Sequence, residues 1–420
     1  MRIVLGVGAG IAAYKVCELL RLFTESGHDV QVVPTQDSLR FVGAATWEAL
    51  SGHPVSTSTW ERVHEVPHVR IGQHADLVFV APATADLLAR AAAGLAPDLL
   101  CNVLLTAACP VIYAPAMHTE MWSHPATAAN VATLRERGAI VLEPASGRLT
   151  GADTGPGRLP EPGELYASAL HVLRRGTAAA VPDLAGRQVV VSAGGTREEL
   201  DPVRFIGNWS SGRQGYAIAA AAVARGASVT LVAANTGLAD PAGANVIGVT
   251  SAGQMRDAVL SASHDADAVV MAAAVADYRP ATRSDTKLKK SGGRPDPIEL
   301  IENPDILREI STTRRRPGQV IVGFGAETTD LLANGQVKLA AKGCDLIVMN
   351  LVGDGVAFGT ADNAAEILTA DGQRLSVPRG PKEVLAEVIW DLIAARLGLP
   401  ARGSEVAPRP GTSDVSEAPG

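Results

Sequence analysis

Short apolar runs alternate with amphipathic stretches along most of the chain, beginning at its first residues. The apolar run at residues 3–7 is followed by a turn at Gly8-Ala-Gly10, an amphipathic stretch at residues 12–26 and a second apolar run at residues 30–33. Strand-length apolar runs on either side of a 3.6-residue periodicity indicate two parallel strands joined by a helix. The chain therefore opens with a predicted βαβ unit.

The same order of elements returns near the middle of the chain. An apolar run at residues 188–192 leads into Gly194 and Gly195, an Ala-rich helical stretch follows at residues 216–225, and another apolar run covers residues 229–232. Glycines between a strand and a helix commonly mark the turn that separates them. A second α/β unit is therefore predicted to begin near residue 188.

Each unit contains one copy of a repeated segment. Residues 75–86 (ADLVFVAPATAD) resemble residues 266–277 (ADAVVMAAAVAD), and each copy reads as a buried strand running into a loop that ends in Asp. In open parallel sheets, ligands bind at the carboxyl ends of the strands, where neighbouring connections diverge to opposite faces. We therefore expect one nucleotide-sized site in each unit.

Length and composition divide the chain further. At 420 residues it exceeds what a single hydrophobic core usually organises, and a stretch of Gly, Ala and Pro at residues 176–186 follows a predicted helix. After residue 399 the chain is rich in Pro, Gly, Ser, Glu and Ala without apolar periodicity, which predicts a disordered tail. The expected divisions are a domain at residues 1–182, a domain at residues 183–399 and a tail at residues 400–420.

Composition, charge and cysteines narrow the classes of function. Hydrophobic residues make up 47% of the chain and charged residues 19%, which suits a folded, soluble protein with buried parallel strands. A net charge of −7 and dispersed Lys and Arg residues argue against a nucleic-acid partner. The four cysteines have no metal-binding or disulfide-framework spacing. Because no signal core and no apolar run of about 18 residues occurs, we expect a cytoplasmic protein without membrane association.

The first turn suggests a phosphate ligand. The segment from Gly8 to Ala13 matches the pattern G-x-G-x-x-A between a strand and a helix, where backbone N–H groups can hold a phosphate. By itself this pattern favours NAD and other phosphate ligands about equally. A dinucleotide site also needs an acidic residue after the second strand, but that strand ends in Val33-Pro34-Thr35. A mononucleotide with a hydroxyl-donating Thr35 fits better.

Four segments of the first half resemble the flavin-dependent cysteine decarboxylases, in order and over residues 1–175. They are residues 6–15 (GVGAGIAAYK), 33–35 (VPT), 81–86 (APATAD) and 115–122 (PAMHTEMW). The resemblance implies a flavodoxin-like domain that binds FMN, which would exchange a hydride with the substrate. The residues that the resemblance places at the flavin are Gly8, Gly10, Ile11, Thr35, Pro82, Ala83 and Thr84.

The same resemblance assigns two catalytic histidines. His68, in the segment HVRI, matches the catalytic histidine of the family, and a group that titrates near neutrality suits proton handling during oxidation of the substrate thiol. His118 stands where the family usually has an Asn that holds the substrate carboxylate, and we expect His118 to donate the same hydrogen bond. His53, His64 and His74 are not assigned a role.

One residue that the family uses is absent. Gly151, in the segment TGADTGPGR at residues 150–158, replaces the family's proton-donating Cys. The proton then comes from Thr150, Asp153, His118 or water, or the product leaves as an enethiol, as in the oxidative peptide decarboxylases of the same superfamily. Two alternatives of another kind are a non-catalytic flavin-binding regulatory module and, from the G-x-G-x-x-A pattern alone, an NAD-dependent dehydrogenase.

The second half resembles another enzyme family. Residues 191–197 (VSAGGTR) and 201–212 (DPVRFIGNWSSG) place turn formers, hydroxyls and Asn between a strand and a helix, without the lysine-containing pattern of a P-loop. These segments resemble the phosphopantothenate–cysteine ligases, and the resemblance extends over residues 185–395. The other segments that carry it are residues 273–280, 287–290, 303–306 and 323–328.

This second resemblance implies that a nucleotide converts the carboxylate of phosphopantothenate to an acyl nucleotide, which the amine of cysteine then attacks. The nucleotide is CTP, used with Mg²⁺, if the bacterial pattern holds, although residue spacing does not distinguish cytosine from adenine. Lys287 is implied at the triphosphate and Asn208 at the acyl nucleotide. The implied nucleotide pocket comprises Asp277, Asn303, Pro304, Asp305, Ile306, Leu307 and Phe324, with further contacts from Lys338 and Lys342.

Together the two resemblances imply a bifunctional enzyme of coenzyme A biosynthesis. Its fold is expected to be α/β, with two tandem Rossmann-like domains built on parallel sheets. The ligase would make phosphopantothenoylcysteine, and the decarboxylase would convert that product to phosphopantetheine. The resemblances also imply a homo-oligomer built from decarboxylase trimers and ligase dimers, with only small molecules as substrates.

Overall fold

The computed structural model describes residues 1–58, 67–148, 154–241, 243–289, 297–327, 330–351 and 362–399. The chain divides into two compact units, Met1–Pro182 and Asp183–Gly420, and each has its own hydrophobic core. No helix in these described ranges is long and apolar enough to cross a membrane. The sequence predictions for His64, Thr150, Gly151, Asp153 and the tail at residues 400–420 lie outside the described residues.

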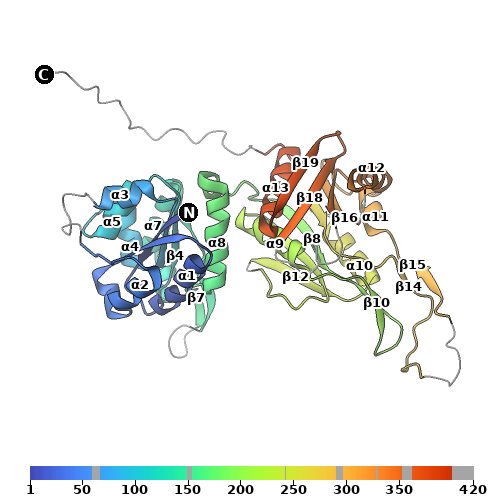
Figure 1. Ribbon diagram of the computed structural model, residues 1–420, viewed down its shortest axis with the longest axis horizontal. Coiled ribbons are helices and arrows are strands. Elements are labelled where there is room, and N and C mark those ends of the chain that lie inside the picture. The colour runs from blue at the N-terminus through green and yellow to red at the C-terminus, as the bar shows by residue number, and fades with distance from the viewer. Residues whose placement is uncertain are drawn as a thin grey trace, which may run out of the picture. The chain divides into compact units, whose positions relative to one another are not determined.

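The first unit is a parallel five-stranded sheet covered by helices (Figure 1). Its elements are β1 (Arg2–Val7), α1 (Ala13–Glu25), β2 (Asp29–Pro34), η1 (Gln36–Arg40), α2 (Ala44–Ser51), α3 (Pro67–His74), β3 (Leu77–Ala83), α4 (Ala85–Ala93), α5 (Leu99–Thr106), β4 (Val111–Pro115), α6 (Thr119–Trp122), α7 (Pro125–Glu136), β5 (Ile140–Val141), β6 (Ala145–Arg148), β7 (Thr154–Arg158), α8 (Pro162–Arg175) and η3 (Gly176–Ala180). The strand order β2-β1-β3-β4-β5 is that of flavodoxin-like folds, as expected.

Alternation along β1 builds two core layers in this unit. Ile3 and Leu5 pack with residues of α1 and α8 on one face of the sheet, whereas Val4 packs with residues of α4 and α5 on the other. Successive side chains of a strand point to opposite faces, so a strand covered on both sides must be apolar throughout. All seven residues of β3 are buried for the same reason.

The second unit contains an eight-stranded sheet in the order β12-β11-β8-β13-β16-β17-β18-β19. Its elements are β8 (Gln188–Gly194), β9 (Arg197–Glu199), β10 (Phe205–Gly207), α9 (Arg213–Ala224), β11 (Ser228–Ala234), β12 (Ala244–Val249), α10 (Ala252–Ala262), β13 (Ala268–Met271), β14 (Tyr278–Pro280), β15 (Leu300–Glu302), α11 (Ile306–Thr312), β16 (Val320–Glu327), α12 (Leu331–Lys342), β17 (Leu346–Leu351), β18 (Asp362–Thr369), β19 (Arg374–Pro381) and α13 (Lys382–Arg396).

The strands from β12 to β17 are parallel and follow the Rossmann order, in agreement with the predicted fold class. The end of the sheet differs from the parallel expectation, because β18 pairs antiparallel with both β17 and β19. A parallel connection needs a crossover of about a dozen residues or more, and the segments at residues 352–361 and 370–373 are shorter than that. The sheet is therefore mixed.

Helices cover both faces of this second sheet. Val189 and Val191 of β8 pack with α9 and α13, whereas Val190 packs with α10 and α11 on the opposite face. Trp390 of α13 is fully buried, and its indole Nε1 donates to the carbonyl of Ile218 in α9 at 2.8 Å. Helix α13 is thus part of the hydrophobic core of this unit.

Among the described residues, three short antiparallel pairs lie outside the two large sheets, and one of them, β9 with β10, falls in the segment that the sequence marks with turn formers. They are β6 with β7, β9 with β10, and β14 with β15. The last pair, called the arm below, comprises residues 278–280 and 300–302 and extends away from the sheet in Figure 1. The arm carries exposed apolar side chains, among them Tyr278, Leu300 and Ile301.

Candidate active sites

The loops after β1, β2 and β3 meet at the carboxyl edge of the first sheet. The Gly8 amide donates to the Pro82 carbonyl oxygen at 3.1 Å, and the Thr35 amide donates to the Val7 carbonyl at 2.9 Å. A Cβ atom on Gly8 would overlap the Pro82 oxygen, so this approach requires glycine. The structure therefore brings together three of the segments that sequence analysis placed at the flavin.

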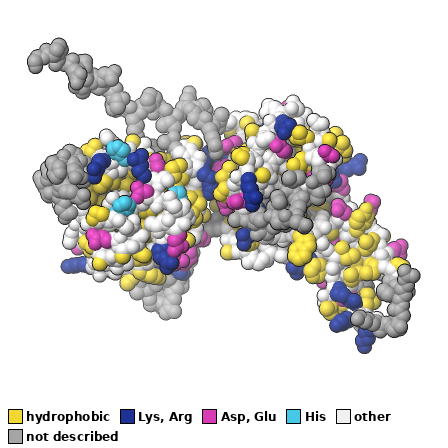
Figure 2. All heavy atoms as spheres, in the orientation of Figure 1, with side chains coloured by type: hydrophobic (Ala, Val, Ile, Leu, Met, Phe, Trp, Pro, Cys, Tyr) yellow, Lys and Arg dark blue, Asp and Glu magenta, His cyan; other side chains and the backbone are white. Residues whose placement is uncertain are grey.

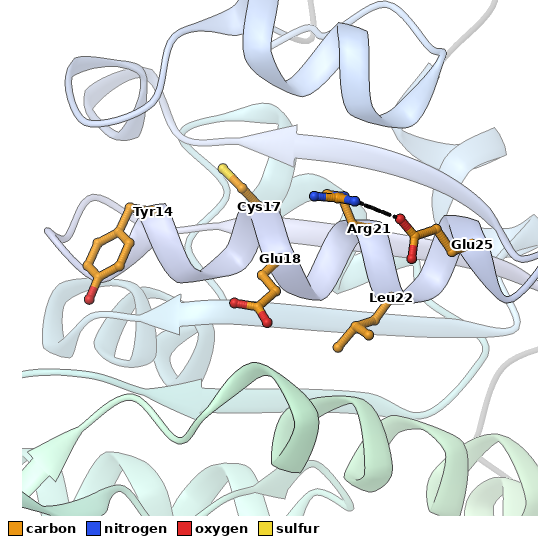
Figure 3. Close-up of a pocket in the computed structure, with 6 residues that line it drawn as sticks. All are labelled: Tyr14, Cys17, Glu18, Arg21, Leu22 and Glu25. Carbon is orange, nitrogen blue, oxygen red and sulfur yellow. Dashed lines mark hydrogen bonds and ion pairs between the residues drawn. The ribbon is translucent and has the colours of Figure 1, made fainter. Parts of the chain in front are cut away.

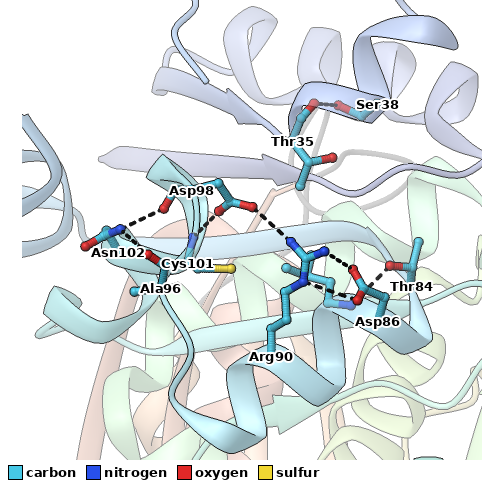
Figure 4. Close-up of polar contacts among 10 residues, drawn as sticks. Thr35, Ser38, Thr84, Asp86, Arg90, Ala96, Asp98, Cys101 and Asn102 are labelled. Atoms are coloured by element: carbon cyan, nitrogen blue, oxygen red, sulfur yellow. Dashed lines mark hydrogen bonds and ion pairs between the residues drawn. The ribbon is translucent and has the colours of Figure 1, made fainter. Parts of the chain in front are cut away.

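The side chain of Thr35 is the most informative group in this cluster (Figure 4). Its Oγ1 is buried and has no hydrogen-bond partner among the described residues, while its carbonyl accepts from the Ser38 hydroxyl at 2.7 Å. Buried hydroxyls are nearly always hydrogen-bonded, and an orphan commonly marks the place of a ligand. A hydroxyl available beside a glycine turn fits a flavin mononucleotide, whose phosphate and ribityl chain need such donors.

The glycine turn contributes differently from what the pattern alone suggests. The amides of Gly8 and Gly10 are already engaged, because the Gly10 amide donates to the Gly8 carbonyl at 3.1 Å. By contrast, the Ile11 and Ala12 amides donate to no other described residue, and no side chain caps α1. Open backbone donors at a helix N-terminus favour an anion. The turn therefore requires glycine at position 8 and leaves the Ile11 amide open.

The segment Pro82 to Thr84 joins β3 to α4. The Ala81–Pro82 peptide is cis, the Ala83 carbonyl accepts from the Ala116 amide at 3.1 Å, and the Thr84 hydroxyl caps α4 by accepting from the Leu87 amide at 3.3 Å. The Thr84 hydroxyl therefore already has a structural role. The backbone contact with Ala116 brings the loop after β4 beside the loop after β3.

An ion-pair network centred on Arg90 lies next to this loop (Figure 4). Arg90 of α4 contacts Asp86 at 2.9 Å and Asp98 at 3.4 Å. Asp98 in turn caps α5 by accepting from the Cys101 amide at 2.8 Å. Burial and the neighbouring Asp98 carboxylate raise the pKa of the Cys101 thiol to about 12, so this thiol stays protonated at neutral pH. The network ties α4 to the start of α5 without supplying a reactive thiolate.

His68 lies on α3, which packs against α5. Its carbonyl accepts from the Thr106 hydroxyl at 2.9 Å, and its Nδ1 is buried without a hydrogen-bond partner among the described residues. No hydrogen bond or ion pair of the described residues joins His68 to the loops after β1, β3 or β4. The structure thus leaves a buried ring nitrogen available, and no hydrogen bond or ion pair of the described residues joins His68 to the other predicted site residues.

His118 lies at the start of α6, opposite a β-hairpin. Its side chain is exposed and does not cap the helix, and the preceding Met117 amide donates to the Gly157 carbonyl of β7 at 2.9 Å. Gly157 has a φ of 148°, and a side chain there would overlap the Met117 carbonyl. Strand β7 is thereby held across residues 117–119, next to His118.

Sequence analysis missed one group at this contact. The Thr119 hydroxyl is buried without a partner among the described residues, and a Cβ on Gly155 would lie 2.5 Å from it. No pattern in the sequence distinguishes Thr119 from an ordinary helix residue, because its exceptional feature is its burial beneath β7.

A separate hollow of about 430 Å³ lies along the outer face of α1 (Figure 3). Its lining residues, which include Tyr14, Cys17 and Glu18, all belong to that one helix. Arg21 and Glu25 form an ion pair across it at 3.0 Å. The hollow contains none of the predicted site residues, and we assign it no chemistry.

In the second unit, the turn after β8 is bonded to the segment after β13. The Thr196 amide donates to the Ala274 carbonyl at 3.1 Å, and the Ala274 amide donates to the Gly194 carbonyl at 2.8 Å. The Thr196 hydroxyl is fully buried and accepts from the Ala276 amide at 2.8 Å. Strands β8 and β13 are the point at which the strand order reverses, where open α/β sheets bind their ligands.

Asn208, Asp277 and Asn303 converge on this edge. The Asn208 amide group donates to the Val275 carbonyl at 3.0 Å. Asn303 donates through its side chain to the Ala276 carbonyl at 2.8 Å, and through its backbone to the Asp277 carbonyl at 2.8 Å. The structure therefore gathers three predicted residues around residues 275–277, with the Asp277 carboxylate exposed to solvent.

The predicted lysines of α12 reach the same region. Lys342 pairs with Asp305 at 2.6 Å, and Lys338 pairs with Glu327 at the end of β16 at 2.6 Å. The side chain of Asp305 also caps α11 by accepting from the Arg308 amide. Both lysines lie on one face of α12, as their spacing predicts, and each forms an ion pair with a carboxylate.

The remaining pocket residues differ in exposure. Pro304 is exposed, whereas Ile306 is buried in the core beneath α11. Leu307 packs against Gly323, because a Cβ on Gly323 would lie 2.5 Å from Cδ2 of Leu307. Phe324 is half-buried against the core. The Ile306 side chain is therefore part of the hydrophobic core.

Lys287 is exposed on a segment tied to the β9–β10 hairpin. The neighbouring Leu288 amide donates to Asp201 Oδ2 at 3.1 Å, and Arg204 forms an ion pair with the same carboxylate at 2.5 Å. The Arg204 hydrogen bond and backbone N–H donors hold the pKa of Asp201 well below its usual range. No hydrogen bond or ion pair of the described residues links Lys287 to Asn208 or Asp277.

Comparison with known proteins identifies the family. Residues 1–174 match the family described as Flavoprotein, and residues 184–397 match the DNA/pantothenate metabolism flavoprotein C-terminal domain. The chain is 58% identical over 409 residues to the coenzyme A biosynthesis bifunctional protein CoaBC of Mycolicibacterium smegmatis, covering 94% of this chain and 98% of that one. The chain belongs to this family of bifunctional coenzyme A biosynthesis proteins.

A more distant member supports the same assignment. The protein of that name from Vibrio vulnificus is 41% identical over 402 residues, which cover 94% of this chain and 98% of the relative. These comparisons confirm the prediction that one coenzyme A biosynthesis enzyme joins a decarboxylase to a phosphopantothenate–cysteine ligase. The flavoprotein match also favours a flavin over the nicotinamide cofactor of the dehydrogenase alternative.

Proposed function

We propose that residues 1–182 carry out FMN-dependent decarboxylation and that residues 183–399 carry out CTP-dependent ligation of phosphopantothenate to cysteine. The observation that carries this proposal is that each unit gathers several of its predicted motifs, apart from His68 and Lys287, at the carboxyl ends of its central strands. Gly8 is bonded to Pro82 and Thr35 to Val7 in the first unit, and Asn208 is bonded to the segment before Asp277 in the second.

In the decarboxylase unit, FMN would supply reversible hydride transfer at the cysteine β-carbon, so that the reaction has no net redox change. Thr35 and the open Ile11 amide would hold the polar chain of FMN. His68 takes the proton of the substrate thiol, and His118 donates a hydrogen bond to the carboxylate before carbon dioxide leaves. The final proton to carbon comes from His118, Thr150, Asp153 or water.

The test for this unit is product identity. Full-length protein supplied with phosphopantothenoylcysteine is expected to give phosphopantetheine, identified by mass. Replacement of His68 by Asn should lower decarboxylation by roughly 100-fold or more, because the proton acceptor is lost. His118→Asn restores the usual family residue and should retain activity. An enethiol product would instead establish the oxidative alternative, and bound flavin without turnover would establish the regulatory one.

In the ligase unit, the phosphopantothenate carboxylate attacks the α-phosphate of CTP, and pyrophosphate leaves. The amine of cysteine then attacks the acyl carbon and displaces CMP. Lys287, Lys338 and Lys342 supply positive charge for the triphosphate, and Asn208 donates to the acyl nucleotide. Mg²⁺ would share the triphosphate charge, and the described residues contain no cluster of three or more His, Cys, Asp or Glu side chains that fixes a metal position.

The ligase test uses phosphopantothenate, cysteine, Mg²⁺ and either CTP or ATP, with pyrophosphate release as the readout. We expect turnover with CTP and loss of most of it in Lys287→Gln. The matched control is Lys289→Gln, which removes an exposed lysine two positions away. Unchanged CTP-dependent pyrophosphate release in Lys287→Gln would remove the proposed role of Lys287, and faster release with ATP would reverse the nucleotide preference.

We also propose a homo-oligomer in which decarboxylase units form trimers and ligase units form dimers. Exposed apolar side chains on the arm and on the β9–β10 hairpin support a dimer contact (Figure 2). Phe205 of β10 is 51% exposed, and Trp209, two residues after that strand, is 88% exposed. The molar mass of the full chain in solution tests this assembly, and a monomer at micromolar concentration would contradict it.

A further inference from the structure

The ligase unit contains a second hollow, of about 770 Å³, that is lined by none of the residues proposed for CTP. It lies at the carboxyl ends of β11 and β12, whereas Asp277 follows β13 and Phe324 lies within β16. Its volume is within the range of about 300–1,000 Å³ that is usual for small-molecule pockets. The polar side chains that line it are Tyr216, Asn235, Thr236, Asp240, Thr250 and Gln254.

The rim of this hollow is fixed by internal hydrogen bonds. Asn235 has a φ of 51°, a sparsely populated conformation for a residue other than glycine, and its amide group donates to the Gly195 and Thr250 carbonyls at 2.8 and 2.9 Å. The hydroxyls of Tyr216 and Thr236 are 2.8 Å apart. The site is thus largely preorganised, because its shape is set before any ligand enters.

Several polar groups remain available once the rim is fixed. The Asp240 carboxylate makes no hydrogen bond or ion pair with the described residues, and neither does the Thr250 hydroxyl. Apolar side chains of Leu238, Val246 and Val249 line the same hollow. The described lining therefore combines an acceptor-only carboxylate, a hydroxyl and an apolar surface.

Charge restricts the class of ligand. The described lining includes Asp240 but no Lys or Arg, so a phosphate or triphosphate would meet a carboxylate without a compensating cation. An uncharged ligand with several hydroxyl donors and one flat apolar ring satisfies both the carboxylate and the apolar lining. In α/β folds of this strand order, an acidic side chain beyond the second strand accepts hydrogen bonds from ribose hydroxyls, and Asp240 lies beyond β11, the second strand of this unit.

We propose that this hollow binds an uncharged ribonucleoside, with the ribose diol on Asp240 and the base on the apolar lining. This site is additional to the CTP site of the proposed ligase reaction. The lining of the hollow shares no residue with the proposed CTP site, so we expect both sites to be occupied together.

The experiment uses the full-length protein and adenosine as the probe, with binding followed by calorimetric titration and by ligand-observed NMR. Adenosine should bind saturably, both alone and in the presence of saturating CTP. 2′,3′-Dideoxyadenosine lacks the diol and should bind at least tenfold more weakly. Asp240→Asn should weaken adenosine binding by at least tenfold, while Asp265→Asn, which removes an exposed carboxylate outside the hollow, should not change it.

Thr250→Val provides a second variant and is expected to weaken adenosine severalfold. CTP-dependent pyrophosphate release in each variant reports whether the unit is folded, and we expect it to be unchanged. Displacement of adenosine by CTP, or loss of adenosine binding in Asp277→Asn with retention in Asp240→Asn, would place the probe in the CTP site and overturn the proposal. Absence of saturable binding, or equal affinity for the dideoxy compound, would also overturn it. Failure of the ligase assay in unmodified protein would instead count against the proposed function.

Discussion

The Gly8 amide and the Pro82 carbonyl oxygen lie 3.1 Å apart in a hydrogen bond that closes the loops after β1 and β3 onto each other. Any side chain at position 8 would overlap that oxygen, whereas the nearest atom to a Cβ on Gly10 is Pro82 Cγ at 3.5 Å. Gly8 and Gly10 therefore differ in whether they tolerate a side chain, and this difference can be measured.

We predict that Gly8→Ala separates the two loops and strips the protein of flavin. Purified variant should show little visible flavin absorption, whereas Gly10→Ala should retain most of it, because 3.5 Å is an ordinary van der Waals contact. Gly43→Ala is the control, since nothing lies within 4 Å of its Cβ and its φ is −68°. Full flavin content in Gly8→Ala would show that the loop contact does not shape the cofactor site.

Asn208 should be a ligase-specific residue. Its side chain donates to the Val275 carbonyl at the edge where Asp277 and Asn303 converge. We expect Asn208→Ala to lower ligase turnover by roughly 100-fold, as is typical when a donor to developing negative charge is removed. Decarboxylation of added phosphopantothenoylcysteine by the same protein should be unchanged. Asn245→Ala, on an exposed position of β12, is the matched control, and equal losses in both variants would contradict the prediction.

Acid should release the segment that carries Lys287. The pKa of Asp201 lies well below its usual range in the folded chain, so its stabilising contribution is complete above the unfolded pKa of about 3.9. That contribution is lost as the pH falls through this value toward the folded pKa. Hydrogen exchange of the Leu288 amide, which donates to Asp201, should therefore lose protection as the pH is lowered.

The variant Asp201→Asn is the control for this effect. It lacks the charged acceptor at every pH, so the protection of Leu288 should be low throughout and should show no additional acid-dependent loss. An acid-dependent loss of equal size in the variant would show that another group is responsible.

Arg225 should be indispensable to the second unit. Its side chain is buried and contacts Asp183 at 2.5 Å, Asp391 at 3.0 Å and Glu387 at 3.5 Å. Removing one partner of a buried ionic group leaves the others uncompensated, so Arg225→Met should lower the free energy of unfolding by about 3–5 kcal/mol. Arg256→Met, which breaks a more exposed pair with Glu309, should cost about 1 kcal/mol or less. Thermal unfolding of the two variants provides the comparison.

Sequence patterns predicted the central elements because those elements are buried on a regular period. The helix expected at residues 12–26 is α1 at Ala13–Glu25, and the strand expected at residues 30–33 is β2 at Asp29–Pro34. The expected strand at residues 188–192 continues to Gly194 as β8, because Ala193 is still covered by helix residues of the core. The secondary structure of such positions can be predicted from sequence because local propensity and tertiary packing favour the same element.

The pairs outside the sheets were harder to predict. The β9–β10 hairpin lies in a segment full of turn residues, and its strands are set by backbone pairing between Glu199 and Phe205 rather than by apolar alternation. The antiparallel end of the second sheet is similarly set by short connections, whose pairing partners the sequence does not specify.

The candidate sites show the same division. Motif resemblance found Thr35 and Asn208, both of which lie at strand ends in the structure, but it could not find Thr119, whose distinction is a buried hydroxyl beneath Gly155. It also could not anticipate that Lys338 and Lys342 are already paired with Glu327 and Asp305. Tertiary contacts between distant segments carry no local signature, so they become visible only in three dimensions.

The partners of Arg225 also affect how the protein can be made. Asp183 is the first residue of the second unit and Asp391 lies in α13, so this one guanidinium joins the beginning of the unit to a helix more than 200 residues later in the chain. During synthesis, the first unit is complete once Pro182 has emerged from the ribosome and can fold while the remainder is translated. The second unit cannot complete the ion pairs of Arg225 until α13 has been synthesised. Chains that stop before α13 should therefore contain a folded flavin domain and an unfolded, protease-sensitive second unit.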